Sequence, residues 1–180
     1  VVETLRGHVE GSLRLNQPFP NFGLAAPSGA GKTELVACLA KAMGTNLLPF
    51  FATPSSKRWQ IAKHIAQGKP HDVIFIDEAH CIGGVGGVAE VLYRCTDPDH
   101  PQVPLVEENR IVENAWVDLP RLTVAMASDN LGLLPKACLE RLCLRVVFEE
   151  YSEDELKTIA LHYASKLNVL LSAQGARELS

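Results

Sequence analysis

A glycine-rich segment ending in lysine and threonine is the first feature of the sequence that could perform chemistry. It reads Ala26-Pro27-Ser28-Gly29-Ala30-Gly31-Lys32-Thr33 and lies between a short apolar run and an amphipathic one. Backbone N–H groups at the start of a helix bind phosphate, a lysine there reaches the β- and γ-phosphates, and the threonine hydroxyl binds magnesium. The usual pattern begins with glycine, and Ala26 can replace it where the backbone keeps a negative φ. The segment therefore predicts a site for ATP and Mg²⁺. Its residues are Pro27, Ser28, Gly29, Ala30, Gly31, Lys32 and Thr33, with Thr33 on the metal.

Two adjacent carboxylates follow a second apolar run. Residues 73–76 are Val-Ile-Phe-Ile, the pattern of a strand buried on both faces of a parallel sheet, and Asp77 and Glu78 come directly after them. Nucleotide hydrolysis needs one carboxylate on the metal and a second one aimed at the attacking water. We therefore expect Asp77 to hold Mg²⁺, through water, and Glu78 to orient or deprotonate the water.

The second motif also has another interpretation, because residues 77–80 spell Asp-Glu-Ala-His, as in DEAH-box helicases. Those helicases insert further nucleic-acid motifs between the phosphate loop and the acids. The interval from Lys32 to Asp77 accommodates only one strand–helix unit, which argues against this alternative.

Elements that alternate along the chain predict how these motifs are positioned. Strands and helices in alternation favour an α/β fold, here a P-loop NTPase with a five-stranded parallel sheet flanked by helices. The expected strands are 22–26, 47–52, 73–76, 122–127 and 144–148. The expected helices are 2–14, 33–43, a helix capped by Ser55 or Ser56 that ends near Gly68, 89–94, 136–142 and 152–166. Ser152 and Glu155 form a capping box at the start of the last one. The proline-rich stretch 97–121 is expected to form a long loop with a β-hairpin. A composition shift near 150 divides a large domain, 1–150, from the start of a helical lid, 151–180.

Charge and composition limit the possible classes of protein. The net charge of −4 gives no overall footprint for nucleic acid, so any contact with DNA must be local. No apolar stretch approaches the roughly 20 residues of a membrane helix, and the first residues do not resemble a signal peptide. The five cysteines form no CxxC pair, and together with the nearby histidines they fit no structural zinc pattern. We expect buried free thiols in a reducing cytoplasm.

Beyond the two motifs, the sequence resembles the RuvB family of AAA+ motors along nearly its whole length. The similarity is carried by 2–6, 88–93, 118–128, 132–134, Glu140-Arg141, 148–156 and 175–178. It implies Mg²⁺-dependent ATP hydrolysis by a ring, of hexameric size, that drives DNA branch migration at a four-way junction in recombination and repair. It also implies a contact with a RuvA-like partner through the hairpin within 103–118, for which an ordinary surface hairpin is the alternative.

The resemblance assigns further roles residue by residue. Arg141 matches the arginine finger, which reaches the ATP of a neighbouring subunit, and Tyr151 matches a tyrosine beside the nucleotide. Sensor 1 falls at Ser128-Asp129, where an acid, Asp129, replaces the usual threonine or asparagine. The matched region begins after the family's first box and ends before its sensor-2 arginine and its winged-helix domain, so DNA is expected to bind through parts outside the chain.

Two other functions remain open from the sequence. One is a clamp-loader or helicase-loader subunit that uses ATP as an assembly switch. The other is a degenerate ATP-binding scaffold, suggested by Ala26 and Asp129. Intact Lys32, Asp77 and Arg141 argue against the scaffold.

Overall fold

The computed structural model describes residues 2–82 and 86–167. The chain divides into two compact units, Val1–Phe148 and Glu149–Ser180. No helix in the described part of the chain is long and apolar enough to cross a bilayer.

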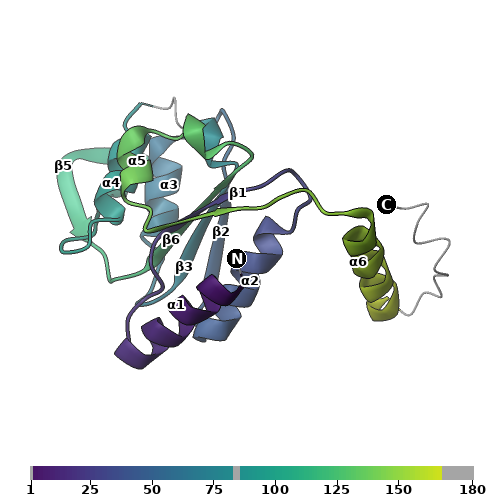
Figure 1. Ribbon diagram of the computed structural model, residues 1–180. Coiled ribbons are helices and arrows are strands. Elements are labelled where there is room, and N and C mark those ends of the chain that lie inside the picture. Colours follow the sequence, from purple (N-terminus) through teal and green to yellow (C-terminus); the bar gives the residue numbers. More distant parts are fainter. Residues whose placement is uncertain (1, 83–85, 168–180) are drawn as a thin grey trace. The chain divides into compact units, whose positions relative to one another are not determined.

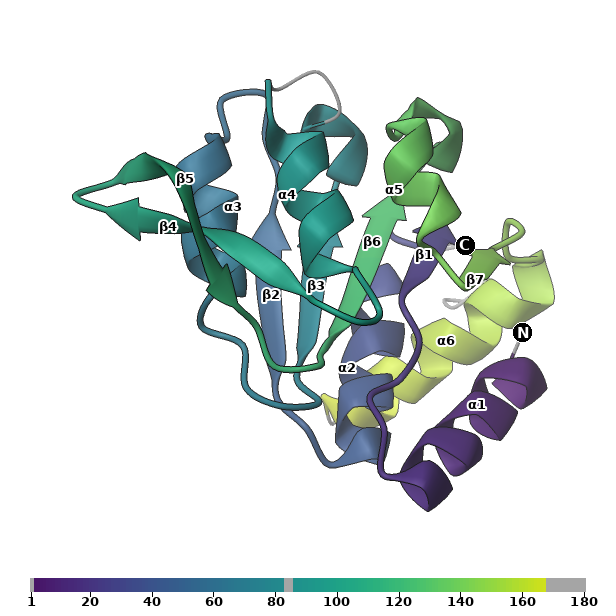
Figure 2. The ribbon, with the colours of Figure 1, turned by 90° about the vertical axis from the view of Figure 1, so that its left-hand side faces the viewer.

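A five-stranded sheet forms the centre of the first unit, in the order β2-β3-β6-β1-β7, with every neighbouring pair parallel. The arrowheads of β2, β3 and β6 point the same way in Figure 2. This confirms the predicted α/β fold. The strands are β1 (Phe22–Ala25), β2 (Leu47–Phe51), β3 (Val73–Asp77), β6 (Thr123–Ser128) and β7 (Leu144–Val147).

Helices cover both faces of this sheet (Figure 1). On one face, α1 (Val2–Leu15) and α2 (Lys32–Met43) pack over the side chains of Phe75 and Ala125. On the other, α3 (Arg58–Ile65), α4 (Val88–Cys95) and α5 (Lys136–Glu140) pack over Ile74, Ile76 and Val124. Neighbouring residues of β3 thus face opposite layers. Its first four residues, 73–76, are all fully buried, which is why they read as an uninterrupted apolar run.

The predicted hairpin is present as two antiparallel strands, β4 (Gln102–Glu107) and β5 (Arg110–Asp118). Its two-residue turn places Glu108 and Asn109 at φ values of 46° and 61°, the left-handed conformation that tight hairpin turns require. The hairpin packs beside α3 and α4 (Figure 2), where the Arg94 guanidinium lies 4.0 Å from the ring centre of Trp116.

The N-terminal cap of helix α3 differs from the predicted one. Helix α3 begins at Arg58, and the side chain of Gln60 accepts a hydrogen bond from the backbone N–H of Lys57 at 2.7 Å. Ser56 instead accepts from the N–H of Thr53 in the preceding turn, so the prediction of a serine cap was wrong.

The described part of the second unit is α6 (Glu153–Lys166). The Ser152 hydroxyl accepts from the N–H of Glu155, whose carboxylate accepts in turn from Ser152, and these contacts form the predicted capping box. They also lower the pKa of Glu155. The segment 175–178, part of the family resemblance, lies outside the described residues.

The cysteine prediction was only partly correct. Cys95 and Cys138 are buried and Cys81 is half-buried, but Cys38 and Cys143 are exposed. Burial raises the pKa of Cys138 to about 11 and that of Cys95 further.

Candidate active site

The glycine-rich segment connects β1 directly to α2, at the carboxyl edge of the parallel sheet. Ala26 continues the ladder of β1, since its N–H donates to the carbonyl of Ser128 at 3.1 Å. Ala26 is not among the described non-glycine residues with positive φ, so alanine is unstrained at the first position of the motif. Gly29 and Gly31 adopt φ of 79° and 84°, values that favour glycine. The loop thus turns sharply and leads into the first helical residue, Lys32.

The side chain of Lys32 is bound within the loop that precedes it. Its ammonium donates to the carbonyls of Ala26 and Pro27 at 3.0 and 3.2 Å. The residue is 6% exposed, an unusual burial for lysine. The contacts fix the ammonium at the concave side of the loop, close to the N-terminus of α2 and its partial positive charge.

The two predicted carboxylates lie at the carboxyl end of β3, in the same sheet. Asp77 is the last residue of β3, is 8% exposed, and accepts from the N–H of Glu78 at 2.9 Å. Glu78 leaves the strand with φ of 52°, a left-handed conformation that is rare for a residue other than glycine, asparagine or aspartate. Backbone strain of this kind is concentrated at functional sites, where the fold holds a side chain in one direction.

A cleft of about 340 Å³ brings the two motifs together. It is lined by Ser28, Gly29, Gly31, Lys32, Thr33, Glu34, Asp77 and Glu78. Five of the loop residues predicted to bind nucleotide therefore face one space with both carboxylates, the predicted metal ligand Asp77 and the predicted base Glu78. The Thr33 hydroxyl and the Asp77 carboxylate are hard oxygen donors of the kind that Mg²⁺ prefers, so the residues present fit this ion.

A polar cluster lies beside Glu78, at the end of β6. His80, on the short helix η1 (Ala79–Ile82), places Nδ1 3.1 Å from the Ser128 hydroxyl. The same nitrogen is 3.5 Å from a carboxylate oxygen of Glu78 and 3.5 Å from one of Asp129. Asp129 is thus near Glu78 in space, although it does not line the cleft itself.

The predicted finger, Arg141, lies away from this cleft, at the amino edge of the sheet. It precedes β7 and lines a separate cavity of about 330 Å³ with Asn21, which precedes β1. Its guanidinium is 3.4 Å from a carboxylate oxygen of Asp97 and 4.2 Å from the ring centre of Tyr93. Backbone N–H groups of the loop after Asp97 lower the pKa of this carboxyl most, and Arg141 lowers it further, so the carboxyl is ionised near neutral pH.

Tyr151 belongs to the second unit, so it is not placed relative to the phosphate loop. It is 36% exposed and precedes the capping box of α6.

Comparison with known proteins identifies the family to which this site belongs. Residues 1–147 match the family model of the Holliday junction DNA helicase RuvB P-loop domain. The chain belongs to this family. Membership decides against the DEAH-box alternative for the carboxylate motif.

Individual relatives agree with this assignment. The chain is 30% identical over 178 residues to the Holliday junction branch migration complex subunit RuvB of Rubrobacter xylanophilus, covering 99% of this chain and 49% of that protein. It superposes on the Thermotoga maritima RuvB Holliday junction branch migration motor with a TM-score of 0.78, at 24% identity over 97% of this chain and 53% of that one. A variant of the same Thermotoga protein gives 0.79 at 25% identity, covering 97% and 54%. The chain spans about half the length of these relatives.

Two residues that contact predicted site residues could not be found from the sequence. In the sequence, His80 is only the last residue of the Asp-Glu-Ala-His motif and one of the histidines near the cysteines, and its contact with Glu78 is not signalled. The described ranges contain no group of three metal-ligating side chains. Asp97 stands at the start of the proline-rich stretch 97–121, for which the sequence predicts only a long loop with a hairpin. Its pairing with Arg141 spans 44 positions of sequence, and no local pattern signals such a contact.

Proposed function

We propose that this chain is the ATP-hydrolysing domain of a ring-shaped DNA motor that drives branch migration at Holliday junctions. The observation that supports this most directly is the single cleft lined by the phosphate loop and by both carboxylates. Family membership favours the junction as the DNA substrate. The unpaired cysteines favour a reducing cytoplasm as the location of the motor.

In this proposal, residues 27–33 bind the phosphates of ATP. The loop's backbone N–H groups and the N-terminus of α2 supply partial positive charge, and the Lys32 ammonium supplies a full one. Thr33 and Asp77 would hold Mg²⁺, which neutralises charge on the phosphate oxygens when it is bound. Glu78 takes a proton from the attacking water or orients it, and its strained backbone aims the carboxylate. The product is ADP with inorganic phosphate.

The remaining assigned residues act at the margins of the cleft or in a neighbouring subunit. Arg141 is separated from its own cleft by the length of β1, four residues or roughly 13 Å. We therefore assign it to the cleft of the next subunit in a ring, and we propose that this ring is a hexamer, as the resemblance to the family implies. Asp129 takes the sensor-1 position, Tyr151 contacts the nucleotide from the lid, and the β4–β5 hairpin contacts a RuvA-like partner. DNA binds through parts outside the chain.

ATPase assays of the full-length protein test this proposal. Hydrolysis should require Mg²⁺ and should be stimulated more by four-way junction DNA than by linear duplex of equal length. Stimulation by a clamp protein instead would favour the loader alternative. ATP binding without hydrolysis under every condition would favour the degenerate scaffold.

A further inference from the structure

We propose that His80 is a positioning residue for ATP hydrolysis, which holds the carboxylate of Glu78 toward the end of β6 and connects it to Asp129. The inference rests on the proposed function, because it gives His80 a role in the same reaction. It concerns a contact that neither motif predicts. It also explains how an acid can occupy the sensor-1 position.

The location of His80 gives it access to both sides of the site. It follows β3 by three residues, on η1, and the N–H of Cys81 donates to the carbonyl of Glu78 at 2.9 Å, which closes a tight turn. This turn carries the imidazole back over Glu78 and against Ser128, which is fully buried. The His80 side chain is 26% exposed, whereas those of Glu78 and Asp129 are 42% and 64% exposed. The imidazole of His80, which lies between the two carboxylates, is therefore the most restrained of the three groups.

The contacts also indicate which ring nitrogen carries a proton. Carboxylates accept hydrogen bonds and do not donate them when ionised, and Nδ1 has a carboxylate oxygen of Glu78 and one of Asp129 at 3.5 Å each. A lone pair on Nδ1 would face negative charge on two sides. The Ser128 hydroxyl, 3.1 Å away, accepts from the N–H of Asn130 at 3.0 Å. Its one hydrogen has two oxygen acceptors, the carbonyl of Asn130 at 3.0 Å and a carboxylate oxygen of Asp129 at 3.3 Å. The other ring nitrogen, Nε2, lies 3.6 Å from Sγ of Cys81, whose S–H can donate to it. The contacts of both nitrogens are therefore satisfied when Nδ1 carries hydrogen.

A shared hydrogen on Nδ1 has a consequence for Glu78. An N–H 3.5 Å from one carboxylate oxygen attracts that oxygen, which favours one direction of the side chain and leaves the other oxygen to accept a proton from water. Asp129 attracts the same N–H and so orients the imidazole, as second carboxylates commonly do for functional histidines. Asp129 thus acts on Glu78 through His80, and a neutral sensor residue at this position is not required for that effect.

Three substitutions at His80 separate positioning from structural support. The amide of asparagine reaches the place of Nδ1, whereas that of glutamine reaches the place of Nε2. We expect His80→Ala and His80→Gln to lower kcat of the full-length protein roughly 10- to 100-fold, since small misplacements of a reacting group have effects of this size. We expect His80→Asn to recover most of that loss. ATP affinity should stay within about twofold for all three, because the lost interaction acts only in the transition state.

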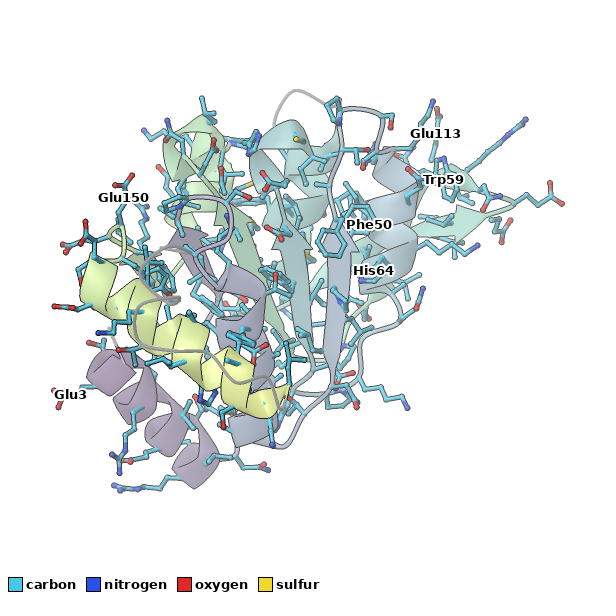
Figure 3. The ribbon with its side chains drawn as sticks, turned by 90° about the vertical axis from the view of Figure 1, so that its right-hand side faces the viewer. Glu3, Phe50, Trp59, His64, Glu113 and Glu150 are labelled. Atoms are coloured by element: carbon cyan, nitrogen blue, oxygen red, sulfur yellow. The ribbon has the colours of Figure 1, made fainter. Side chains whose placement is uncertain are left out.

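His64 provides a matched control. It lies on α3, contacts the carbonyl of Leu48 at 3.2 Å through Nε2, and has its ring centre 5.3 Å from that of Phe50 (Figure 3). It does not line the phosphate cleft. His64→Ala removes a half-buried histidine with comparable contacts, so it should lower the melting temperature while leaving kcat unchanged. Thermal unfolding of every variant shows which of them are folded at the assay temperature.

Asp129 is tested by a double-mutant cycle. Asp129→Ala should lower kcat alone and should add little to His80→Ala, because its effect passes through the imidazole. Selective ¹⁵N-histidine labelling should show hydrogen on Nδ1 of His80, and this readout does not depend on turnover.

The possible results distinguish the inference from the proposed function. Parental kcat in His80→Ala, an asparagine variant no better than the glutamine one, or a neutral His80 with hydrogen only on Nε2 would each overturn the positioning role. Fully additive losses would overturn the connection to Asp129. A parental protein without ATPase activity would overturn the proposed function, and this inference with it.

Discussion

Replacement of Arg141 by alanine has two consequences that differ greatly in size. Within its own subunit the Arg141 side chain is 23% exposed, and its guanidinium lies over the ring of Tyr93, a contact worth about 0.5–1 kcal/mol. The ion pair with Asp97 adds little, because both side chains remain accessible to water, which screens their attraction. The variant should therefore fold, with a melting temperature lower by only a few degrees.

The catalytic consequence is expected to be much larger. A finger that completes a neighbouring phosphate site contributes on the order of 10³-fold or more to hydrolysis, equivalent to about 4 kcal/mol of transition-state stabilisation. Arg141→Ala should thus bind ATP like the parent, but its rate of ATP hydrolysis should be too low to measure beside the parental rate. Lys136→Ala is the matched control, because it removes a 90% exposed cation from the adjoining helix α5 and should retain parental activity.

Mixed assemblies test whether Arg141 acts between subunits. Arg141→Ala subunits keep an intact cleft, and Lys32→Ala subunits keep an intact arginine, so each variant supplies what the other lacks. In a random equal mixture of a head-to-tail ring, about a quarter of the interfaces combine both intact halves. ATPase activity should recover toward that fraction, measured after co-assembly is verified by light scattering. No recovery in a verified mixture would refute an action between subunits.

Four further predictions concern single residues. Lys32→Ala should abolish ATP binding in calorimetry, because the loop loses the only full positive charge of its motif. Glu78→Gln should bind ATP like the parent and lose turnover; parental hydrolysis by this variant would exclude Glu78 as the base. Gly23→Ala should lower the free energy of unfolding by about 1–3 kcal/mol, because a Cβ there would lie 2.8 Å from Cδ1 of Leu142, and denaturant titration checks this. Cys138, with its pKa raised to about 11 by burial, should resist alkylation at pH 8 until the protein unfolds, which mass spectrometry can follow.

Sequence alone was sufficient for the parts of the fold whose signals are local. The five strands of the sheet, the P-loop helix ending at Gly44 and the capping box of α6 each follow from a short pattern, and all were predicted nearly in place. The cap of α3 was not, because serine, lysine and glutamine near 55–60 offer competing hydrogen bonds. Only the tertiary fold selects between them.

The candidate site divides in the same way. The cleft between the phosphate loop and Asp77 could be predicted because parallel strands present their carboxyl ends at one edge. The contacts of His80 with Ser128 and of Arg141 with Asp97 join positions 48 and 44 residues apart. Neither follows from periodicity, because both depend on how η1, α4 and α5 pack around strand ends.

The placement of charge at the two edges of the sheet bears on how subunits could assemble. The phosphate cleft lies at the carboxyl edge and Arg141 at the amino edge, with the strand β1 between them. A subunit whose complementary halves lie on different surfaces completes a neighbour's site by a heterologous contact, and repeated heterologous contacts form a closed ring when the rotation closes. A symmetric pair would have to bring both edges into one self-complementary patch. With Arg141 in its proposed role, the positions of the cleft and the arginine favour a head-to-tail ring, in which one subunit binds each ATP and the next subunit completes the site.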